Sequence, residues 1–124
     1  MKIKIDKTLY AISKLDKYDK IPAWINFDSF FSITNTDEEF SIVCEEKFVP
    51  KNIISDLGWN ILKIVGPLDF SLIGILSNIS SILAKEGISI FAISTYDTDY
   101  ILVKSDKIDQ TIEVLKRSDY EIVE

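Results

Sequence analysis

Histidine is absent from this 124-residue sequence, and cysteine occurs once, at Cys44. Without histidine the chain lacks the commonest general base and metal ligand, and every Ser-His or Cys-His catalytic pair is excluded. A single cysteine cannot form an intrachain disulfide, and zinc sites of the usual His/Cys type are excluded as well. The sequence therefore predicts no metal, no other cofactor and no enzymatic activity.

Long apolar runs and a basic charge balance are also missing. No apolar stretch is long enough to cross a bilayer, and the first residues, MKIKID, lack the apolar region of a signal peptide. These features predict a cytoplasmic protein that does not bind membranes. The net charge of −6 repels nucleic-acid phosphates, and Lys14, Lys17 and Lys20 form only a loose basic cluster. We expect no nucleic-acid partner.

Apolar residues make up 47% of the chain, which is enough for a hydrophobic core. In the second half their spacing predicts strand, helix, strand, strand, helix and strand in that order. The strands are expected at 59–65, 88–94, 99–104 and 120–123, and the helices at 72–83 and 108–115. Two βαβ crossovers joined by a hairpin predict an α+β, ferredoxin-like βαββαβ unit, an antiparallel sheet with helices on one face.

The helix ends carry their own signals. Asp69 or Ser71 can cap the first helix, and Ser105 can cap the second. Gly87 follows the first helix, at the position where a left-handed residue is favoured. Gly74 falls within the predicted first helix, where a glycine permits close packing.

The first half reads as a reduced copy of the same unit. Strands are predicted at 9–15, 30–34 and 40–44, whereas the helices shrink to short pieces that begin at Pro22 and Pro50. We therefore expect two units, an N-terminal one at 1–57 and a C-terminal one at 58–124. Two placements stay open: the strand at 59–65 either closes the first unit or opens the second, and residues 1–5 can add an edge strand.

Three side chains are predicted to be structural. Cys44 lies in an alternating strand, and nothing nearby would lower the pKa of its thiol, so a buried and inert cysteine is expected. Trp24 and Trp59 are predicted to lie in the core or at an interface.

Two polar segments have both a structural and a functional interpretation. The junction 66–71, followed by Gly74, is either a tight turn or a helix start whose backbone N–H groups bind an anion. The segment 94–100 (STYDTDY) is either a good turn or a site where Asp99 binds an ammonium or guanidinium group. Asp97 and Asp99 are too few ligands to indicate a metal site.

Several segments resemble one known family. The run 93–103 (ISTYDTDYILV) resembles the signature of CASTOR-like ACT domains, and 30–43 resembles the hairpin of that family's first unit. Residues 21–24 and 58–70 match the family as well, so the resemblance spans nearly the whole chain. The family includes small bacterial tandem-ACT proteins and the eukaryotic cytosolic arginine sensor. The resemblance implies two ACT units and a regulatory, ligand-binding role.

The resemblance also implies a site. In the sensor, arginine lies between two ACT units that contribute different edges, and backbone groups hold its carboxylate or amine. Asp99 is implied to bind the positive charge. The matching positions here are Ser89 and Ile90 on one edge, and Gly74, Ile75, Thr95 and Asp99 on the other. The sensor carries four ACT units, whereas this chain has material for two. We therefore expect a homodimer with the 88–94 strands near the two-fold axis.

Two functions remain open at this point. The first is a regulatory module that binds an amino acid or a similar small molecule, alone or with an unidentified protein partner. The second is a structural dimerisation module with a vestigial pocket that acts through protein–protein interaction. A ligand that raises the melting temperature distinguishes the first function from the second.

Overall fold

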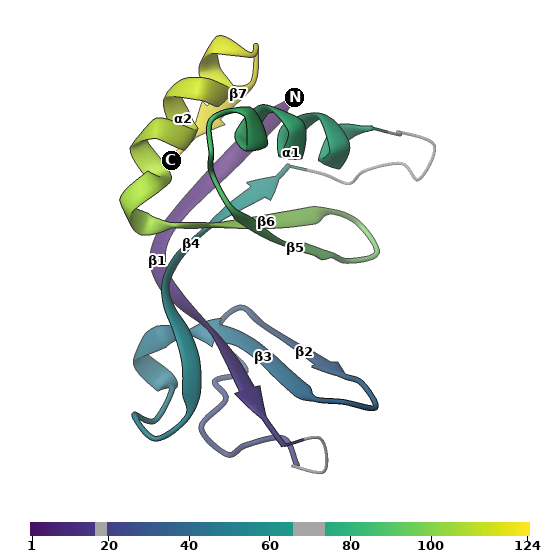
Figure 1. The fold of residues 1–124 in the computed structure, drawn as a ribbon, viewed down its shortest axis with the longest axis vertical. Helices are drawn as coiled ribbons and strands as arrows, with labels where there is room; N and C mark the ends of the chain where they lie inside the picture. Colours follow the sequence, from purple (N-terminus) through teal and green to yellow (C-terminus); the bar gives the residue numbers. More distant parts are fainter. Residues whose placement is uncertain (17–19, 66–73) are drawn as a thin grey trace. The chain divides into compact units, whose positions relative to one another are not determined.

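The structure, a computed structural model, describes residues 1–16, 20–65 and 74–124 (Figure 1). The predicted junction 66–71, with the caps Asp69 and Ser71, lies outside the described residues, as do Lys17 and Leu72. No helix in the described ranges is long and apolar enough to span a membrane. The elements are β1 Lys2–Leu15, β2 Phe31–Asn35, β3 Phe40–Glu45, η1 Glu46–Phe48, β4 Ile54–Ile64, α1 Ile75–Lys85, β5 Ile90–Ser94, β6 Asp99–Lys104, η2 Ser105–Lys107, α2 Ile108–Arg117 and β7 Glu121–Val123.

The chain forms two compact units. The large unit contains Met1–Lys7 and Asn60–Glu124, and the small unit contains Thr8–Trp59. The expected boundary at 57/58 lies close to the observed one at 59/60, but the first seven residues belong with the second half of the chain. The α+β, ferredoxin-like fold class is confirmed.

The large unit has the strand order β5-β6-β4-β1-β7, with α1 and α2 packed on one face. Residues 2–7 of β1 therefore do not form an edge strand. They pair with β7 in parallel, Lys2 opposite Glu121, and with β4 on the other side. Ile3 and Ile5 are therefore buried in the core, completely or nearly so. On an edge strand these two side chains would be more exposed.

The two ends of α1 show why sequence signals succeed in one case and fail in another. Gly87 has φ 71°, and the amides of Gly87 and Ile88 bond to Ala84 and Leu83, so the predicted left-handed end is confirmed. The prediction for Gly74 is wrong. It precedes the helix as its N-cap residue with φ 83°, and a Cβ there would meet no atom within 4 Å. Backbone conformation, and not close packing, requires this glycine.

The predicted cap of the second helix is also wrong. Ser105 begins the 3-10 helix η2, and α2 starts three residues later at Ile108 without a side-chain cap. The amphipathic face predicted for this helix nevertheless packs into the core, because Ile108, Thr111 and Leu115 are buried.

The small unit has the strand order β2-β3-β1-β4. Its predicted short helices are single turns, in which the amides of Ile25 and Ile53 bond to the carbonyls of Pro22 and Pro50. Trp24 and Ile25 pack against the strand residues Phe40, Ile42 and Cys44 in place of a helix.

The strand that had two possible assignments belongs to both units. β4 runs from Ile54 to Ile64 across the boundary at Trp59 and Asn60. Its first part closes the small unit beside β1, and its second part lies between β1 and β6 in the large unit. Trp59 is buried, as predicted, and its indole N–H donates to Asp56.

Candidate functional site

The β5–β6 hairpin positions the segment that the resemblance points to. The amide and the hydroxyl of Thr95 both donate to the carbonyl of Thr98, at 2.8 and 3.1 Å. Thr98 itself is buried, and its hydroxyl donates to the carbonyl of Ile64 at the end of β4. These bonds fix the hairpin turn to the sheet, so the residues beside the turn have a defined position.

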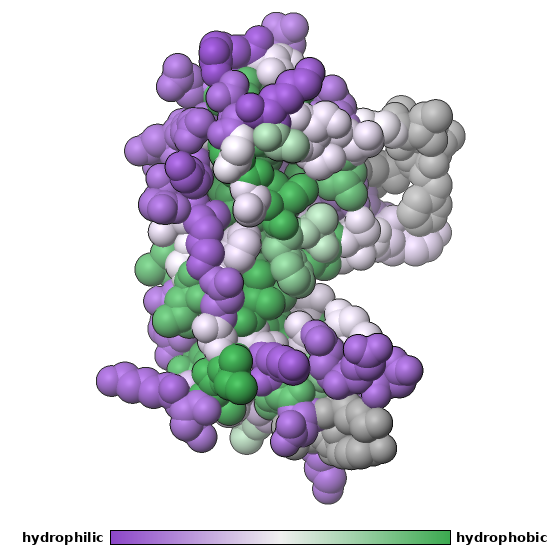
Figure 2. Space-filling view, viewed as in Figure 1, coloured by the Kyte–Doolittle hydropathy of each residue, from purple (hydrophilic) through white to green (hydrophobic). Residues whose placement is uncertain are grey.

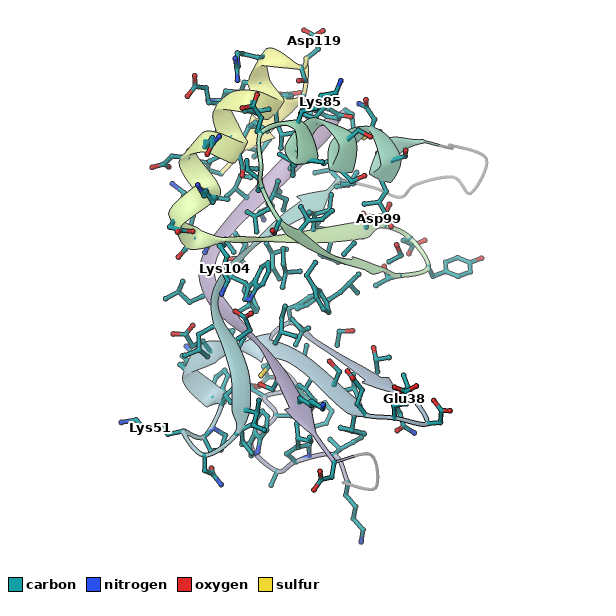
Figure 3. All side chains as sticks on the ribbon, in the orientation of Figure 1. Glu38, Lys51, Lys85, Asp99, Lys104 and Asp119 are labelled. Atoms are coloured by element: carbon teal, nitrogen blue, oxygen red, sulfur yellow. The ribbon has the colours of Figure 1, made fainter. Side chains whose placement is uncertain are left out.

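Asp99 is the first residue of β6 and pairs with Ser94 across the hairpin. Ser94 Oγ donates to Asp99 Oδ1 at 2.5 Å, which orients the carboxylate. By strand alternation Asp99 lies on the same face as Ile101 and Val103, the face that the helices cover. The Asp99 side chain lies at the hairpin end of β6, on the side of the sheet where α1 runs (Figure 3). It is half-buried, so an ion or ligand can reach it.

Gly74 and Ile75 form the start of α1, and this start lies at the same end of the sheet as the hairpin (Figure 1). Gly74 is exposed, and as a glycine it has no side chain that could cap the helix. The N–H groups of a first helical turn have no partner within the helix and favour an anion. Thus Gly74, Ile75, Thr95 and Asp99 gather at one end of the large unit.

Ser89 and Ile90 lie elsewhere. Ile90 begins β5 opposite Val103, and exposed Ser89 precedes it, so both are at the end of β5 remote from the hairpin. A strand rises about 3.3 Å per residue, so Ser89 and Ser94 are roughly 16 Å apart. A free amino acid cannot contact both groups in one subunit. The structure brings four predicted residues together and separates the other two from them.

The small unit repeats the hairpin but lacks the acid. The amide and the hydroxyl of Thr36 donate to the carbonyl of Glu39, as those of Thr95 donate to Thr98. The residue that follows Glu39 is Phe40, which is buried in the core, where Asp99 follows Thr98. Only the large unit therefore presents a carboxylate at this position, which makes the site specific to one of the two units.

β5 is an edge strand, because it ends the strand order. Its sequence, IFAIS, has no charge and no proline, the two features that usually block pairing at an edge. In the described ranges no strand pairs with the outer edge of β5, so the backbone groups of this edge are open to another strand.

Other candidate groups do not extend this site. Cys44 is 2% exposed, and burial, followed by the charge of Glu45, raises the pKa of its thiol to about 11. The prediction of a buried cysteine is confirmed. Within the described residues no group of three or more His, Cys, Asp or Glu side chains is placed to hold a metal ion.

Sequence reasoning missed two contributors. Ser94 and Thr98 orient the carboxylate and anchor the turn, yet both look like ordinary turn residues in the sequence. The cross-strand pairing of Ser94 with Asp99 could be deduced from the hairpin register, but the contact of Thr98 with Ile64 spans 34 residues and leaves no local signal.

Comparison with protein families adds the decisive observation, because the family model of the ACT domain matches residues 54–117. The chain belongs to the ACT-domain family. A second family model, which describes an N-terminal domain, matches residues 8–52. The ACT match runs from the first residue of β4 to the last residue of α2, and therefore includes the hairpin and the start of α1.

Curated relatives confirm the resemblance to CASTOR-like ACT-domain proteins. The human cytosolic arginine sensor for mTORC1 subunit 1 is 36% identical over 97 residues, and the bovine protein matches to the same extent. Each match covers 72% of this chain and 30% of the relative. The chain therefore spans less than a third of the length of these relatives.

Solved structures show the same architecture. A crystal structure of a protein from Agobacterium tumefaciens is 38% identical with a TM-score of 0.92, and the match covers 98% of this chain and 91% of that one. The alpha and beta subunits of an aspartokinase match with a TM-score of 0.68 at 18% identity, over 94% of this chain and 96% of that chain. The aspartokinase likeness shows the fold alone.

Proposed function

We propose that this ACT-domain protein is a non-catalytic regulatory module of the cytosol that binds a free amino acid between two copies of the chain. The observation that carries the proposal is the half-buried Asp99 carboxylate, which Ser94 orients at the same end of the large unit as the start of α1. The arginine sensor named among the relatives supports an amino acid as the class of ligand.

The start of α1 and the Asp99 carboxylate together suit a zwitterionic ligand. The N–H groups at the start of α1 favour the ligand's carboxylate, and Asp99 accepts charge-assisted hydrogen bonds from its ammonium or guanidinium group. Because Asp99 is only half-buried, a second surface over the site would strengthen both interactions by excluding water.

A two-fold pairing of β5 strands would supply that surface. If two copies of β5 pair in antiparallel fashion about Ala92, the midpoint of the strand, then Ser89 of one copy lies opposite Thr95 of the other. Ile90 of the first copy lies opposite Ser94 of the second. Ser89 and Ile90 of each copy would then lie close to the hairpin residues Thr95 and Asp99 of the other copy. The dimer would therefore contain two equivalent sites. Both the open edge and the separation of the groups support this arrangement.

A thermal-shift screen of the common amino acids, followed by calorimetry on each hit, tests the function. We expect L-arginine or another amino acid to raise the melting temperature, because a ligand that binds only the native state stabilises it. Asp99→Ala should weaken binding at least about 100-fold, since it removes a charged partner from a partly dry site.

The matched control is Asp97→Ala, which removes an exposed carboxylate from the same hairpin. This variant should bind like the wild-type protein. If no amino acid stabilises the protein, or if Asp99→Ala binds a confirmed ligand unchanged, the proposed site is wrong. The dimer would then act as a structural module that engages another protein.

A further inference from the structure

Ser94 occupies one of the two carboxylate oxygens of Asp99. The hydroxyl of Ser94 donates to Asp99 Oδ1 at 2.5 Å, a length typical of a hydrogen bond to a charged oxygen. The two residues pair across the β5–β6 hairpin, so Oδ1 is directed toward β5. Oδ2 is therefore the oxygen that Asp99 offers to a bound cation.

The cations that an amino acid can present differ in what they require from a carboxylate. A guanidinium forms its strongest pair through two parallel hydrogen bonds, one to each carboxylate oxygen. An ammonium group is a compact charge that can be paired through a single oxygen. Because Ser94 takes Oδ1, the arrangement at Asp99 favours an ammonium group.

Two carbonyl acceptors at the hairpin turn are also in use. The carbonyl of Thr98 accepts hydrogen bonds from both the amide and the hydroxyl of Thr95, at 2.8 and 3.1 Å. The carbonyl of Ile64 accepts a hydrogen bond from the hydroxyl of Thr98. A guanidinium has five N–H donors and an ammonium has three, so a guanidinium would leave more donors unpaired in a partly dry site.

The charged side chains of the large unit's helices are concentrated elsewhere. They gather over the outer surface of α2, which lies away from the hairpin turn (Figure 2). There Arg117 and Glu86 form an ion pair at 3.6 Å. In the turn itself Asp97 is the carboxylate, and it is exposed. Asp99 is thus the half-buried carboxylate that the hairpin offers to a ligand.

We propose that Ser94 makes the site selective for an ammonium group, so that Asp99 holds the α-ammonium of an α-amino acid and not a side-chain guanidinium. The start of α1 then binds the α-carboxylate of the same molecule. All α-amino acids share these two groups, so binding does not require the cation of an arginine side chain. This inference rests on the proposed function, because it concerns the same site.

Three ligands that share a five-carbon acid test the selectivity on the full chain. L-norvaline carries the α-ammonium without a guanidinium, 5-guanidinopentanoate carries the guanidinium without an α-ammonium, and L-arginine carries both. By calorimetry, we expect L-norvaline to bind at least about tenfold more tightly than 5-guanidinopentanoate. L-arginine should bind about as tightly as L-norvaline.

Ser94→Ala frees Oδ1 for the second hydrogen bond of a guanidinium. The preference for L-norvaline over 5-guanidinopentanoate should therefore fall at least about fivefold in this variant. Ser94→Thr is the matched control, because it keeps a hydroxyl at this position, and it should retain the preference of the wild-type protein. Ser94 is exposed, so both variants should fold. An unchanged preference in Ser94→Ala would overturn the proposal.

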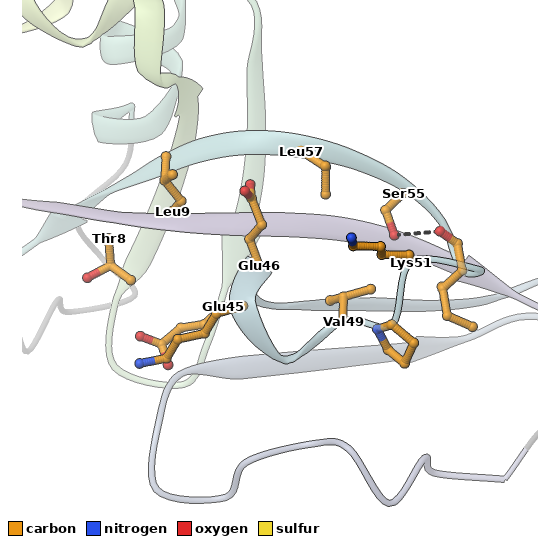
Figure 4. A pocket seen from close by; sticks show the side chains of 11 residues that line it. Thr8, Leu9, Glu45, Glu46, Val49, Lys51, Ser55 and Leu57 are labelled. Atoms are coloured by element: carbon orange, nitrogen blue, oxygen red, sulfur yellow. Dashed lines mark hydrogen bonds between the residues drawn. The ribbon is translucent and has the colours of Figure 1, made fainter.

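The small unit offers these ligands another place to bind. A groove of about 680 Å³ beside η1 is lined by residues that include Glu46 and Lys51 (Figure 4). The amide of Gly58 donates to Glu46 Oε2 at 2.9 Å, so this carboxylate also has one oxygen occupied. Glu46→Gln removes the charge but keeps an acceptor for Gly58. It should leave the affinities for all three ligands unchanged.

The possible results separate this inference from the proposed function. If 5-guanidinopentanoate binds at least as tightly as L-norvaline, or if another amino acid binds and L-norvaline does not, the ammonium selectivity is wrong while the proposed function stands. If no amino acid binds, or if Glu46→Gln abolishes binding, the proposed site itself is wrong.

Discussion

At the scale of single residues, the account depends on a carboxylate that its neighbours hold in place. Asp99 could be singled out from the sequence because an acid at the first position of an apolar strand is uncommon. Its orientation could not be predicted, since it requires the hydroxyl of Ser94 across the hairpin. The small unit supplies an internal comparison, in which Phe40 takes the place of the acid and is buried.

Thr98→Val should destabilise the protein by about 1–3 kcal/mol, because it leaves the carbonyl of Ile64 without its donor in a buried position. Urea unfolding of the two proteins measures this difference. Thr95→Val is the control, since Thr95 is exposed and its backbone amide bonds to the same carbonyl as its hydroxyl. The control should cost about 0.5 kcal/mol or less. Equal costs for the two substitutions would refute a special role for the buried hydroxyl.

At the scale of elements, strands were easier to predict than helices and their ends. Alternating apolar residues marked β1, β3 and β6, because alternation is imposed by the two faces of a sheet. The start of β4 was missed, since Gly58 looks like a break in the sequence. In the structure Gly58 lies within the strand with φ 81°, and its amide bonds to Glu46. A side-chain contact across 12 residues thus stabilises a conformation that local sequence disfavours.

A prediction at the scale of elements concerns the edge strand β5. Ala92→Lys should convert the expected dimer into a monomer, because the two lysines would lie side by side at the two-fold axis and repel each other. Light scattering after size-exclusion chromatography measures the mass. The monomeric variant should also lose affinity for the amino acid, since each site would lack half of its residues.

Ala84→Lys is the control for this experiment, because Ala84 is exposed on α1 and away from β5. It should leave both mass and affinity unchanged. A wild-type protein that is monomeric at all concentrations would contradict the role assigned to β5.

At the scale of the whole molecule, the sequence predicted two related units but not how the chain is divided between them. The spacing of hydrophobic residues is a local signal. It therefore predicted two consecutive segments of the chain as the two units. The pairing of β1 with β4 joins the start of the chain to its middle, and the pairing of β1 with β7 joins the two ends of the chain. That pairing places Ile3 and Ile5 in the core of the large unit, and no local sequence pattern predicts it.

The central claim also concerns the whole molecule. We propose that each ligand site combines Ser89 of one copy with Asp99 of another. Ser89→Trp should block the site from one side, and Asp99→Ala should remove the charge from the other. Ser89 is exposed, so the larger side chain should leave the fold intact. In a heterodimer of the two variants, one site would carry both substitutions and the other would carry neither.

Calorimetric titration of that heterodimer, purified through two different affinity tags, is the most direct test. The account predicts one bound amino acid per heterodimer, whereas each parent homodimer binds none. If every site lay within a single chain, each site of the heterodimer would carry one substitution. A heterodimer that binds no ligand, while the wild-type dimer binds two, would therefore contradict a site shared between subunits.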